Sequence, residues 1–483
     1  MTVYPSAPMT LSATSSELCF MNALRLAELV RTREVSAREV MAAHLDQIGR
    51  VNPAVNAIVA KLDDDACLAL AVQADRGDPI GPLHGLPIAF KDLEPAVGFP
   101  MTLGSPIFRD FRPASDSALV ERLRLAGAIP IGKTNVPEFG MGSHSYNSVY
   151  GTTRNPYDTT KSAGGSSGGA GAALATGMLP IADGSDLGGS LRNPANFNNI
   201  VALRPTVGLV PRTPVLQPLF VSLGVKGPMG RSVADVAFLL SVMAGADPRD
   251  PMSYPSDPAL FARPLGRDFD GVRIAWCLDL GGLPLDRRVR DVLEAQRSVF
   301  ESLGCVVEDA APDLSDADDI FLTLRTWQTS VGLGPLLKDH RKRMKPEAVW
   351  EIERGARLSA AEVADAMSRH GQLLERLRRF QTTHDFVVCA VNQVPPFDAD
   401  IDWPKEIDGV QMDTYIGWMR SAYRISVTMC PAASVPAGFA DGGLPVGIQI
   451  VGRHRDDFGV LQLAHAFEQA TRVGDTRPAI ALR

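Results

Sequence analysis

Hydrophobic residues along the chain alternate between the spacing of helices and the short unbroken runs of buried strands. The segment 23–51 repeats apolar residues at helical spacing and predicts two amphipathic helices. The second of them opens with a capping-box pattern between Ser36 and Glu39. The apolar run 86–90 predicts a buried strand, and a helix over 117–126 is expected to lead into another strand at 128–131.

Helical and strand patterns continue to alternate in the remainder of the chain. Small residues after position 169 predict a helix that packs closely against a sheet. The later elements predicted are a helix over 234–244, a proline-punctuated link over 247–264, a strand over 272–276, a helix over 286–303, charged helices within 335–380, apolar strands at 386–391 and 444–451, and a helix over 460–470. The predicted fold class is α/β: a large mixed, mainly parallel sheet covered by helices on both faces.

Composition agrees with a large α/β enzyme. The chain has 483 residues, of which 45% are hydrophobic and 6% aromatic, enough for an extensive core. Residues 1–16 are rich in Ser, Thr and Pro, and we predict a flexible segment there. Residues 17–483 are predicted to form one domain, with a helical and variable portion at about 250–385.

Charge and cysteine usage exclude several classes of function. The net charge is −7 without a basic stripe, so nucleic acid is not an expected partner. The six cysteines form no CxxC pair, which gives no support to a zinc site, a redox pair or a disulfide framework. We expect no metal and no cofactor. The N-terminus lacks a signal-peptide pattern and no apolar stretch could cross a bilayer, so a cytoplasmic protein without membrane contact is predicted.

Two glycine runs that carry serines lie near the middle of the chain, at 164–169 and 183–192. Serine among glycines leaves backbone N–H groups uncovered, which a site that stabilises an oxyanion requires. Upstream, Lys91 follows directly on an apolar run. Two serines and a buried lysine together indicate a hydrolase whose base is an amine rather than an imidazole.

The segment 127–134 formally matches the phosphate-loop pattern GxxxxGK[ST]. That motif needs a strand before its first glycine and a helix that starts at the lysine, whereas a helix is predicted before Gly127. The interior of the segment is apolar, and Pro137 stands where the helix should be established. We therefore interpret the segment as a strand.

Residues 164–168 also satisfy GxSxG, the nucleophile elbow of α/β-hydrolases, with Ser166 as the nucleophile. The elbow requires an apolar strand before it, but 154–162 is polar and contains Pro156. Most of the available histidines lie among charged residues, where a solvated side chain is expected. A nucleophile elbow at Ser166 is therefore less well supported than a hydrolase whose base is an amine.

Several separate motifs resemble those of the amidase signature family. The resemblance covers about residues 20–470 and rests on the glycine run 164–169, the segment 184–194, the Lys91-Asp92 context, residues 132–139, 153–156 and 203–206, and the C-terminal segments 434–438 and 443–449. It implies the amidase signature fold and an enzyme that hydrolyses carbon–nitrogen bonds other than peptide bonds. Free-standing amidases of this family need no cofactor.

The resemblance also implies a role for individual residues. Ser190 matches the nucleophile, Ser166 the bridging serine that follows a cis peptide bond, and Lys91 the base of a Ser-cisSer-Lys triad. The remaining implied positions are the backbone N–H groups of the oxyanion hole at Leu187, Gly188, Gly189 and Ser190, the supporting residues Ser167, Asp186 and Arg192, and the pocket residues Met141, Gly142 and Ser143.

Acid–base chemistry agrees with these roles. A serine hydroxyl is a poor nucleophile until a base takes its proton, and lysine can take it only when neutral. The pKa of Lys91 must then fall from about 10.4 toward 7–8, and burial behind the apolar run would lower it. Asp92 would oppose that shift, but neighbouring residues of a strand point to opposite sides. The expected product is an acyl-enzyme on Ser190, which water hydrolyses.

The substrate stays open at this point. The apolar segment 215–221 favours small aryl or alkyl amides as substrates. Carbamates (urethanes) or esters need the same attack and remain alternatives, as does the glutamine amidase subunit of a tRNA-dependent amidotransferase, although its Arg-Arg-Ile stretch is not found here. A non-catalytic binding protein is the alternative from another class. A monomer or a homodimer fits equally well.

Overall fold

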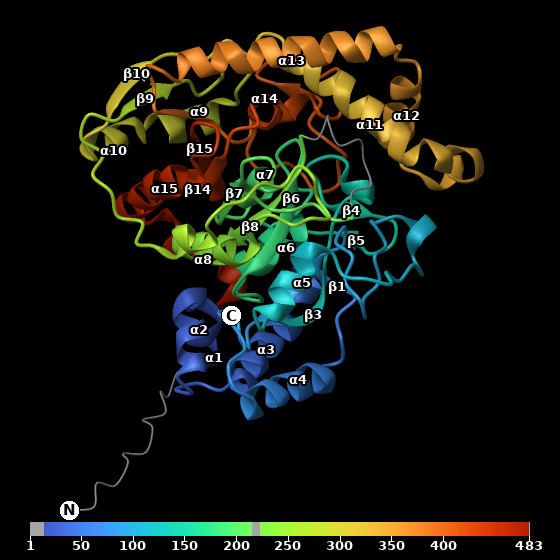
Figure 1. The fold of residues 1–483 in the computed structure, drawn as a ribbon, viewed down its shortest axis with the longest axis vertical. Helices are drawn as coiled ribbons and strands as arrows, with labels where there is room; N and C mark the ends of the chain where they lie inside the picture. The colour runs from blue at the N-terminus through green and yellow to red at the C-terminus, as the bar shows by residue number, and fades with distance from the viewer. Residues whose placement is uncertain (1–13, 215–222, 483) are drawn as a thin grey trace, which may run out of the picture.

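The computed structural model describes residues 14–214 and 223–482, and Figure 1 shows the arrangement of its elements. The N-terminal part consists of helices packed beside a small sheet. These elements are α1 (Ser15–Phe20), α2 (Ala23–Arg31), α3 (Ala37–Val55), β1 (Ile58–Val59), α4 (Asp64–Arg76), β2 (Pro87–Lys91), α5 (Ala118–Leu125) and β3 (Ile129–Thr134). The small sheet has the order β1-β3-β2, with β2 parallel to β3 and β1 antiparallel to it.

Eight strands form the central sheet. They are β6 (Ala182–Asp186), β7 (Val201–Arg204), β8 (Val225–Gly230), β9 (Arg273–Trp276), β10 (Val306–Asp309), β11 (Phe386–Ala390), β14 (Ala432–Ala440) and β15 (Leu444–Val451), in the spatial order β10-β9-β11-β15-β14-β7-β8-β6. Two short hairpins, β4 (Tyr146–Asn147) with β5 (Gly151–Thr152) and β12 (Glu406–Ile407) with β13 (Val410–Gln411), complete the strands of the described residues.

The central sheet is mixed, as predicted, but most of its adjacent strand pairs are antiparallel. Only β9 pairs in parallel with its neighbours β10 and β11, and every other adjacent pair is antiparallel. The expectation of a mainly parallel sheet is therefore wrong. One of these antiparallel pairs is the hairpin of β14 and β15, in which a tight Asp-Gly-Gly turn at 441–443 reverses the chain without a crossover helix, and the other four follow from the strand order.

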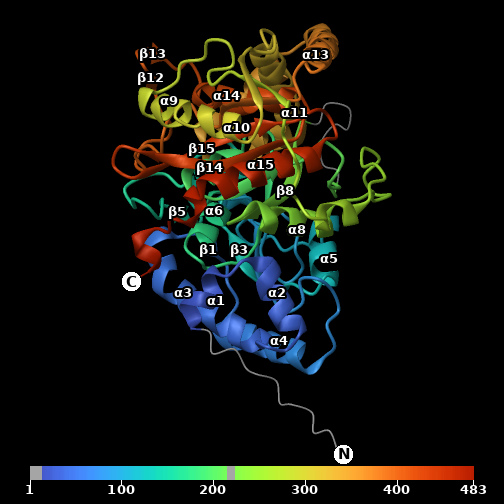
Figure 2. The same cartoon turned by 90° about the vertical axis from the view of Figure 1, so that its left-hand side faces the viewer.

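Helices cover both faces of the central sheet, and Figure 2 shows these layers from the side. The helices after β5 are α6 (Gly168–Ala175), α7 (Arg192–Phe197), α8 (Val233–Met243), α9 (Arg287–Glu294), α10 (Arg297–Ser302), α11 (Ala317–His340), α12 (Pro346–Ala356), α13 (Ala360–Phe380), α14 (Arg420–Val427) and α15 (Asp457–Thr471).

Alternate residues of the strands belong to two separate hydrophobic clusters. On β11, Phe386 and Val388 pack in the cluster that includes α8, α9 and α15, whereas Val387 and Cys389 pack in the cluster that includes α11 and α14. Successive side chains of a strand point to opposite faces of the sheet, so this division is the expected result of a sheet buried on both sides.

Most elements predicted from the hydrophobic pattern are confirmed with shifts of a few residues. The capping box of Ser36 and Glu39 is present at the start of α3, and the phosphate-loop look-alike lies in β3. The single helix expected over 286–303 is wrong, because the chain forms α9 and α10 with a break at 295–296. The break lets the two helices pack against different elements, α9 against β14 and α10 against β10 and α15.

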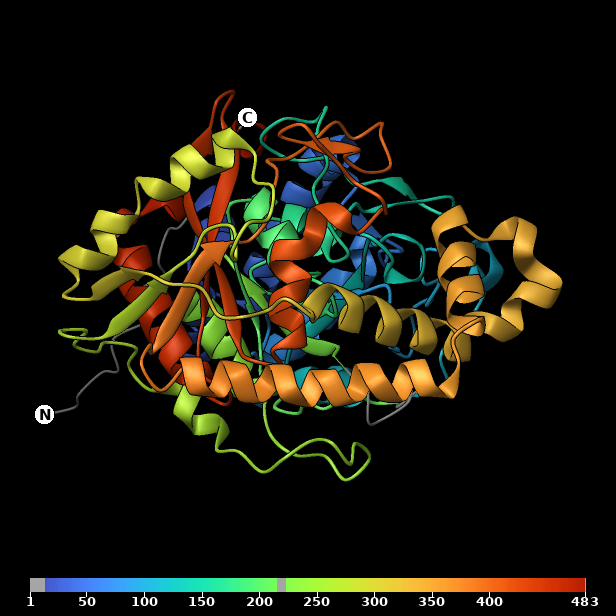
Figure 3. The ribbon, with the colours of Figure 1, turned by 90° about the horizontal axis from the view of Figure 1, so that it is seen from above.

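The predicted N-terminal boundary also differs from the structure. Residues 1–13 lie outside the described residues, and α1 begins at Ser15, two residues before the expected domain start, with a capping box formed by Thr14 and Glu17. The portion predicted to be helical and variable, 250–385, contains α9 to α13 but also β9 and β10. Figure 3 shows α11 and α12 projecting to one side of the sheet.

The two sheets meet where the end of β2 lies beside β6, the edge strand of the central sheet. The backbone N–H of Lys91 donates to Asp183 Oδ1 across this junction, at 3.1 Å. Every residue of β2 is buried, as its apolar sequence predicts. The junction therefore places Lys91 in the interior of the molecule, next to both serine-bearing glycine runs.

Two further findings bear on the expectations from composition. All six cysteines are buried and unpaired. In the part of the chain that the structure describes, no helix combines the length and the apolar character that crossing a bilayer requires.

Candidate active site

The amine of Lys91 lies among hydroxyl groups. Its Nζ atom is 2.9 Å from Ser166 Oγ, 2.8 Å from Ser167 Oγ and 2.9 Å from Ser185 Oγ, with the carbonyl oxygen of Ser185 at 3.3 Å. No carboxylate of the described residues bonds to the amine. Asp92 instead accepts hydrogen bonds from Thr102, as expected if neighbouring strand residues face opposite sides.

The groups around the amine of Lys91 are compatible with its neutral form. Burial lowers the pKa of Lys91 to about 7, although the negative charges of Asp183, Glu94 and Asp186 act in the opposite direction. A neutral amine has two N–H donors and one lone pair. The carbonyl of Ser185 can only accept, while each hydroxyl can either accept from the amine or donate to its lone pair. The site can therefore hold the amine with Ser166 as the donor.

The loop after β6 carries Ser190, and the carboxylate of Asp186 fixes the course of that loop. Asp186 Oδ1 accepts the backbone N–H of Gly189 at 2.9 Å, and Oδ2 accepts that of Leu191 at 3.2 Å. The backbone N–H of Ser167 donates to the carbonyl of Ser190 at 3.2 Å. These bonds tie the loop to the start of α6 and bring the two serine runs together.

Three of the four N–H groups predicted for an oxyanion hole are available. No described residue accepts from the backbone N–H of Leu187, Gly188 or Ser190, whereas Asp186 engages that of Gly189. Gly189 has φ +113°, and a Cβ there would lie 2.6 Å from the amide of Asn193. Only glycine fits this turn, which leaves the neighbouring N–H groups without side-chain cover.

Two arginines neutralise Asp186 in the interior. Nη2 of Arg192 lies 2.9 Å from Asp186 Oδ1 and Nη1 of Arg204 lies 3.2 Å from it, and all three side chains are fully buried. Burial alone would raise the pKa of Asp186, but the two guanidinium groups hold it well below its usual range. Arg192 also donates to Gln449 on β15, so the loop is anchored to the centre of the sheet.

The segment before α6 has the backbone expected at this point. The peptide bond between Gly165 and Ser166 is cis. Gly165 lies against residues 143–145, where an added Cβ would be 3.0 Å from the backbone nitrogen of His144. No hydrogen bond joins Ser166 or Ser190 to a histidine in the described ranges. The side chain of Ser166 thus bonds to the amine of Lys91 and to no histidine of the described residues.

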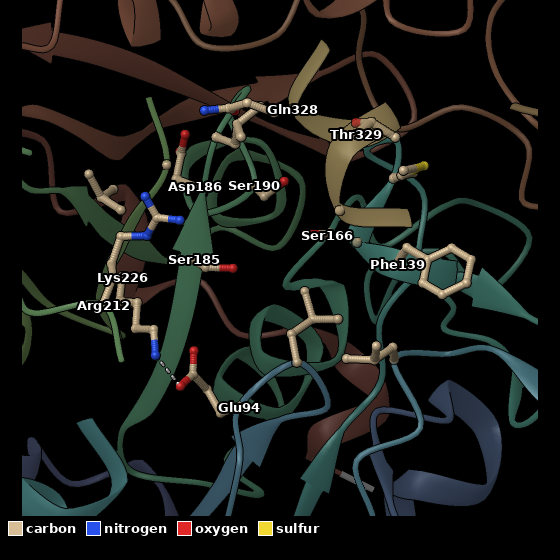
Figure 4. Close-up of a pocket in the computed structure, with 18 of the residues that line it drawn as sticks. Glu94, Phe139, Ser166, Ser185, Asp186, Ser190, Arg212, Lys226, Gln328 and Thr329 are labelled. Carbon is tan, nitrogen blue, oxygen red and sulfur yellow. Dashed lines mark hydrogen bonds and ion pairs between the residues drawn. The ribbon is translucent and has the colours of Figure 1, made fainter. Parts of the chain in front are cut away.

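Ser166, Ser185 and Ser190 face one cavity of about 370 Å³, shown in Figure 4. Phe139 lies on one side of it, and Arg212 lies on the other with the ion pair of Lys226 and Glu94, whose atoms are 2.6 Å apart. The apolar residues of the wall are Leu93, Pro95, Met101, Leu103, Phe139, Met141, Leu187, Pro214, Val225 and Leu333.

Of the three predicted pocket residues, Met141 lines this cavity. Gly142 and Ser143 are not among the described residues of its wall; Gly142 lies near Tyr415, and Ser143 Oγ accepts from Asn193 Nδ2 at 2.7 Å. The apolar segment 215–221, expected to shape the pocket, lies outside the described residues.

Sequence reasoning missed several residues of the site. Ser185 lies inside the second glycine run, and its position two residues from Asp183 on a strand could have indicated a shared face. Arg204 belongs to one of the family-like motifs, but its pairing with Asp186 cannot be inferred from their spacing. The contribution of α11 to the cavity, which comprises Arg325, Gln328, Thr329, Gly332 and Leu333, had no signal in that charged and variable portion of the sequence.

Comparison with known proteins gives consistent matches along almost the whole chain. The family model described as Amidase matches residues 39–461. An acylamidase of Rhodococcus erythropolis is 33% identical over 97% of this chain and 99% of its own length. A glutamyl-tRNA(Gln) amidotransferase chain of Symbiobacterium thermophilum is 35% identical over 95% and 99%. The crystal structure of a bacterial aryl acylamidase superposes with a TM-score of 0.87 at 29% identity, covering 94% and 98%.

The buried pairing of Asp186 gives a test of stability. Asp186→Asn leaves two buried guanidinium groups without their counter-charge, so we expect the free energy of unfolding to fall by about 3–5 kcal/mol. Glu301→Gln, which breaks an exposed pair with Arg297 on the surface, should cost less than about 1 kcal/mol. Urea denaturation of both variants measures the difference. Equal small losses would contradict the central role of the Asp186 pairing.

Proposed function

This chain belongs to the amidase family and is an amide-hydrolysing enzyme, and from that premise we propose that Ser190, Ser166 and Lys91 carry out its reaction. Support comes from the hydrogen bond between Lys91 Nζ and Ser166 Oγ, and from the cavity that both serines face. The hydrogen bond is the observation that carries the proposal. It joins the buried amine of Lys91 to a hydroxyl beside the proposed nucleophile loop, and no carboxylate of the described residues is bonded to that amine.

In the proposed reaction, neutral Lys91 takes a proton from Ser166 while Ser166 takes one from Ser190. Ser190 Oγ then forms a bond to the substrate carbonyl carbon, and the carbonyl oxygen becomes an oxyanion. The free N–H groups of Leu187, Gly188 and Ser190 would stabilise that charge, with Gly189 held in place by Asp186. The C–N bond breaks, the proton returns through Ser166 to the leaving amine, and water hydrolyses the acyl-enzyme.

The supporting residues act on the geometry of this relay. Ser167 accepts one N–H of the neutral Lys91 amine and the carbonyl of Ser185 accepts the other, which leaves the lysine lone pair for a hydroxyl donor such as Ser166. Asp186 and Arg192 hold the loop that presents Ser190, and neither lies within hydrogen-bond distance of the Ser190 hydroxyl. We therefore assign them positioning roles.

The wall of the cavity favours small amides with an apolar aryl or alkyl group. Aliphatic and aromatic side chains form much of the wall, and the charges that line it are compensated, as in the pair of Lys226 with Glu94. An aryl amide is also the kind of substrate for which the aryl acylamidase with a similar fold is named. A carbamate or ester could react at the same groups, because the attack and the oxyanion are the same.

The second candidate function is that of a glutamine amidase in a tRNA-dependent amidotransferase. The observation that supports this function is the similarity to several subunits of glutamyl-tRNA(Gln) amidotransferases, which match nearly the full chain. It requires recognition of the free α-amino and α-carboxylate groups of glutamine. Activity toward glutamine therefore distinguishes the two candidates.

Labelling with a fluorophosphonate tests the nucleophile. Mass spectrometry of the labelled enzyme should place the adduct on Ser190, and Ser190→Ala should remove it. Ser166→Ala should slow the labelling by about 100-fold or more, the usual contribution of proton transfer. Ser241→Ala, on the distant helix α8, should label like the parent enzyme. An adduct on Ser166, or no adduct, would contradict the assignment.

The pH dependence of kcat/KM tests the base. A lysine with a lowered pKa of about 7 is protonated and inactive below that pH, so kcat/KM should fall about tenfold per pH unit on the acid side and level off above it. Lys91→Arg keeps a charged donor but cannot accept a proton, and should lose at least about 100-fold in kcat. An active variant with an unchanged acid limb would exclude Lys91 as the base.

A substrate panel tests the preference. We expect a higher kcat/KM for an acetanilide than for acetamide or glutamine, because the apolar wall binds the aryl group. Leu333→Ala should weaken kcat/KM for the anilide about tenfold, the order expected for lost apolar contact. Leu336 is equally half-buried on α11 but does not line the cavity, so Leu336→Ala should change nothing. If glutamine is turned over fastest, the result supports the amidotransferase function. If an aryl carbamate is turned over fastest, it supports a urethanase.

A further inference from the structure

Asp183 is a buried carboxyl group beside Lys91 that the proposed relay does not use. Its Oδ1 accepts the backbone N–H of Lys91, and its Oδ2 has no hydrogen-bond partner among the described residues. The side chain is fully buried. Buried polar atoms are nearly always paired, so an orphaned carboxylate oxygen next to the proposed base requires an explanation.

The geometry of β6 directs Asp183 and Ser185 to the same place. Residues two apart on a strand share a face, and both of these reach Lys91, one at its backbone nitrogen and the other at its amine. Asp186 lies on the opposite face, where Arg192 and Arg204 neutralise it. The face of β6 that carries Asp183 and Ser185 therefore contacts both the backbone nitrogen and the side-chain amine of Lys91.

The charges around Lys91 explain which carboxyl group can hold a proton. The carboxyl groups that act on Lys91 are Asp183, Glu94 and, across β6, Asp186, and Lys133 on β3 lies near Asp183, Glu94, Asp92 and Lys226. Glu94 is bonded to Lys226 and Ser117, and Asp92 to Thr102. Both oxygens of Asp186 are bonded as well. Asp183 is the carboxyl group of this set with a fully buried oxygen that lacks a partner among the described residues.

Charge balance then links Asp183 to the state of Lys91. On the side of β6 that faces the lysines, Lys133 and Lys226 offset Asp92 and Glu94, and Lys91 is the remaining counter-charge for an ionised Asp183. Arg192 and Arg204 lie with Asp186 on the opposite face of the strand. When Lys91 is neutral, an ionised Asp183 is therefore left without a counter-charge on its own face in a buried region. A proton on Asp183 removes that uncompensated charge. Burial and the nearby charge of Glu94 hold the pKa of Asp183 well above its usual range, in the direction that this balance requires.

We infer that Asp183 is a positioning residue for the base: it fixes the backbone of Lys91 against β6 and shares one proton with its amine. The inference rests on the proposed role of Lys91. An ionised Asp183 favours the ammonium form of Lys91, and a protonated Asp183 favours the neutral amine that can accept from Ser166. The pH at which kcat/KM rises is therefore set by the coupled protonation of Asp183 and Lys91 rather than by Lys91 alone.

Asp183→Asn removes the charge and keeps an oxygen that can accept from the Lys91 N–H. Without the anion, Lys91 should lose its proton at lower pH, so the acid limb of kcat/KM for an acetanilide should move down by about 0.5–1 pH unit. Asp183→Leu is also neutral but removes the acceptor. It should shift the limb in the same direction while lowering kcat and the unfolding temperature.

Asp235 provides a matched control far from the site. It is also fully buried, its Oδ1 accepts a backbone N–H from Ala23 at 2.6 Å, and its Oδ2 is unpartnered among the described residues. Asp235→Asn should lower stability without moving the acid limb. A limb that stays in place in both neutral variants of Asp183, or moves to higher pH, would overturn the inference.

The same data separate this inference from the proposed function. If Lys91→Arg stays active, the base itself is wrongly assigned. If Lys91→Arg is inactive and the Asp183 variants keep the parent profile, only the shared proton is excluded. Because both variants of Asp183 are neutral, either one that folds decides the question.

Discussion

The burial of one amine among hydroxyl groups is the constraint on which the site depends. Lys91 has no carboxylate of the described residues bonded to its Nζ, and burial lowers its pKa to about 7. A direct ion pair would instead favour the ammonium form and remove the lone pair that a base needs. The structure therefore has to remove the lysine from water without giving its amine an anion, and the surrounding elements are arranged to do so.

The junction of the two sheets meets this requirement. The end of the fully buried strand β2 lies against the edge strand β6, so Lys91 is covered from both sides. The hydroxyls that replace its water come from two separate segments, Ser166 and Ser167 before α6 and Ser185 on β6. Ser166 extends from this buried amine to the cavity, which supports the proposed bridging role.

The sequence was sufficient to predict the local parts of this arrangement. The apolar run before Lys91 predicted a buried strand, and the glycines around Ser190 predicted a loop with uncovered N–H groups; both are present. The order of strands in the central sheet depends on long-range pairing that periodicity does not report, so the antiparallel majority was missed. The cavity wall contributed by α11 was missed for a similar reason: its residues follow a helical surface pattern and meet the site only through the fold.

The two aspartates of β6 show how one strand can carry opposite electrostatic environments. Asp183 and Asp186 are three residues apart and so face opposite sides of the strand. Two buried guanidinium groups keep Asp186 ionised, and it uses that charge to hold the backbone of the proposed nucleophile loop. Asp183 is bonded to no guanidinium group of the described residues, and its pKa is raised by burial. A fixed anion therefore shapes the loop on one face, while the carboxyl group on the other face has a raised pKa and lies beside the lysine. Pairs of similar groups whose environments separate their pKa values are typical of acid–base sites.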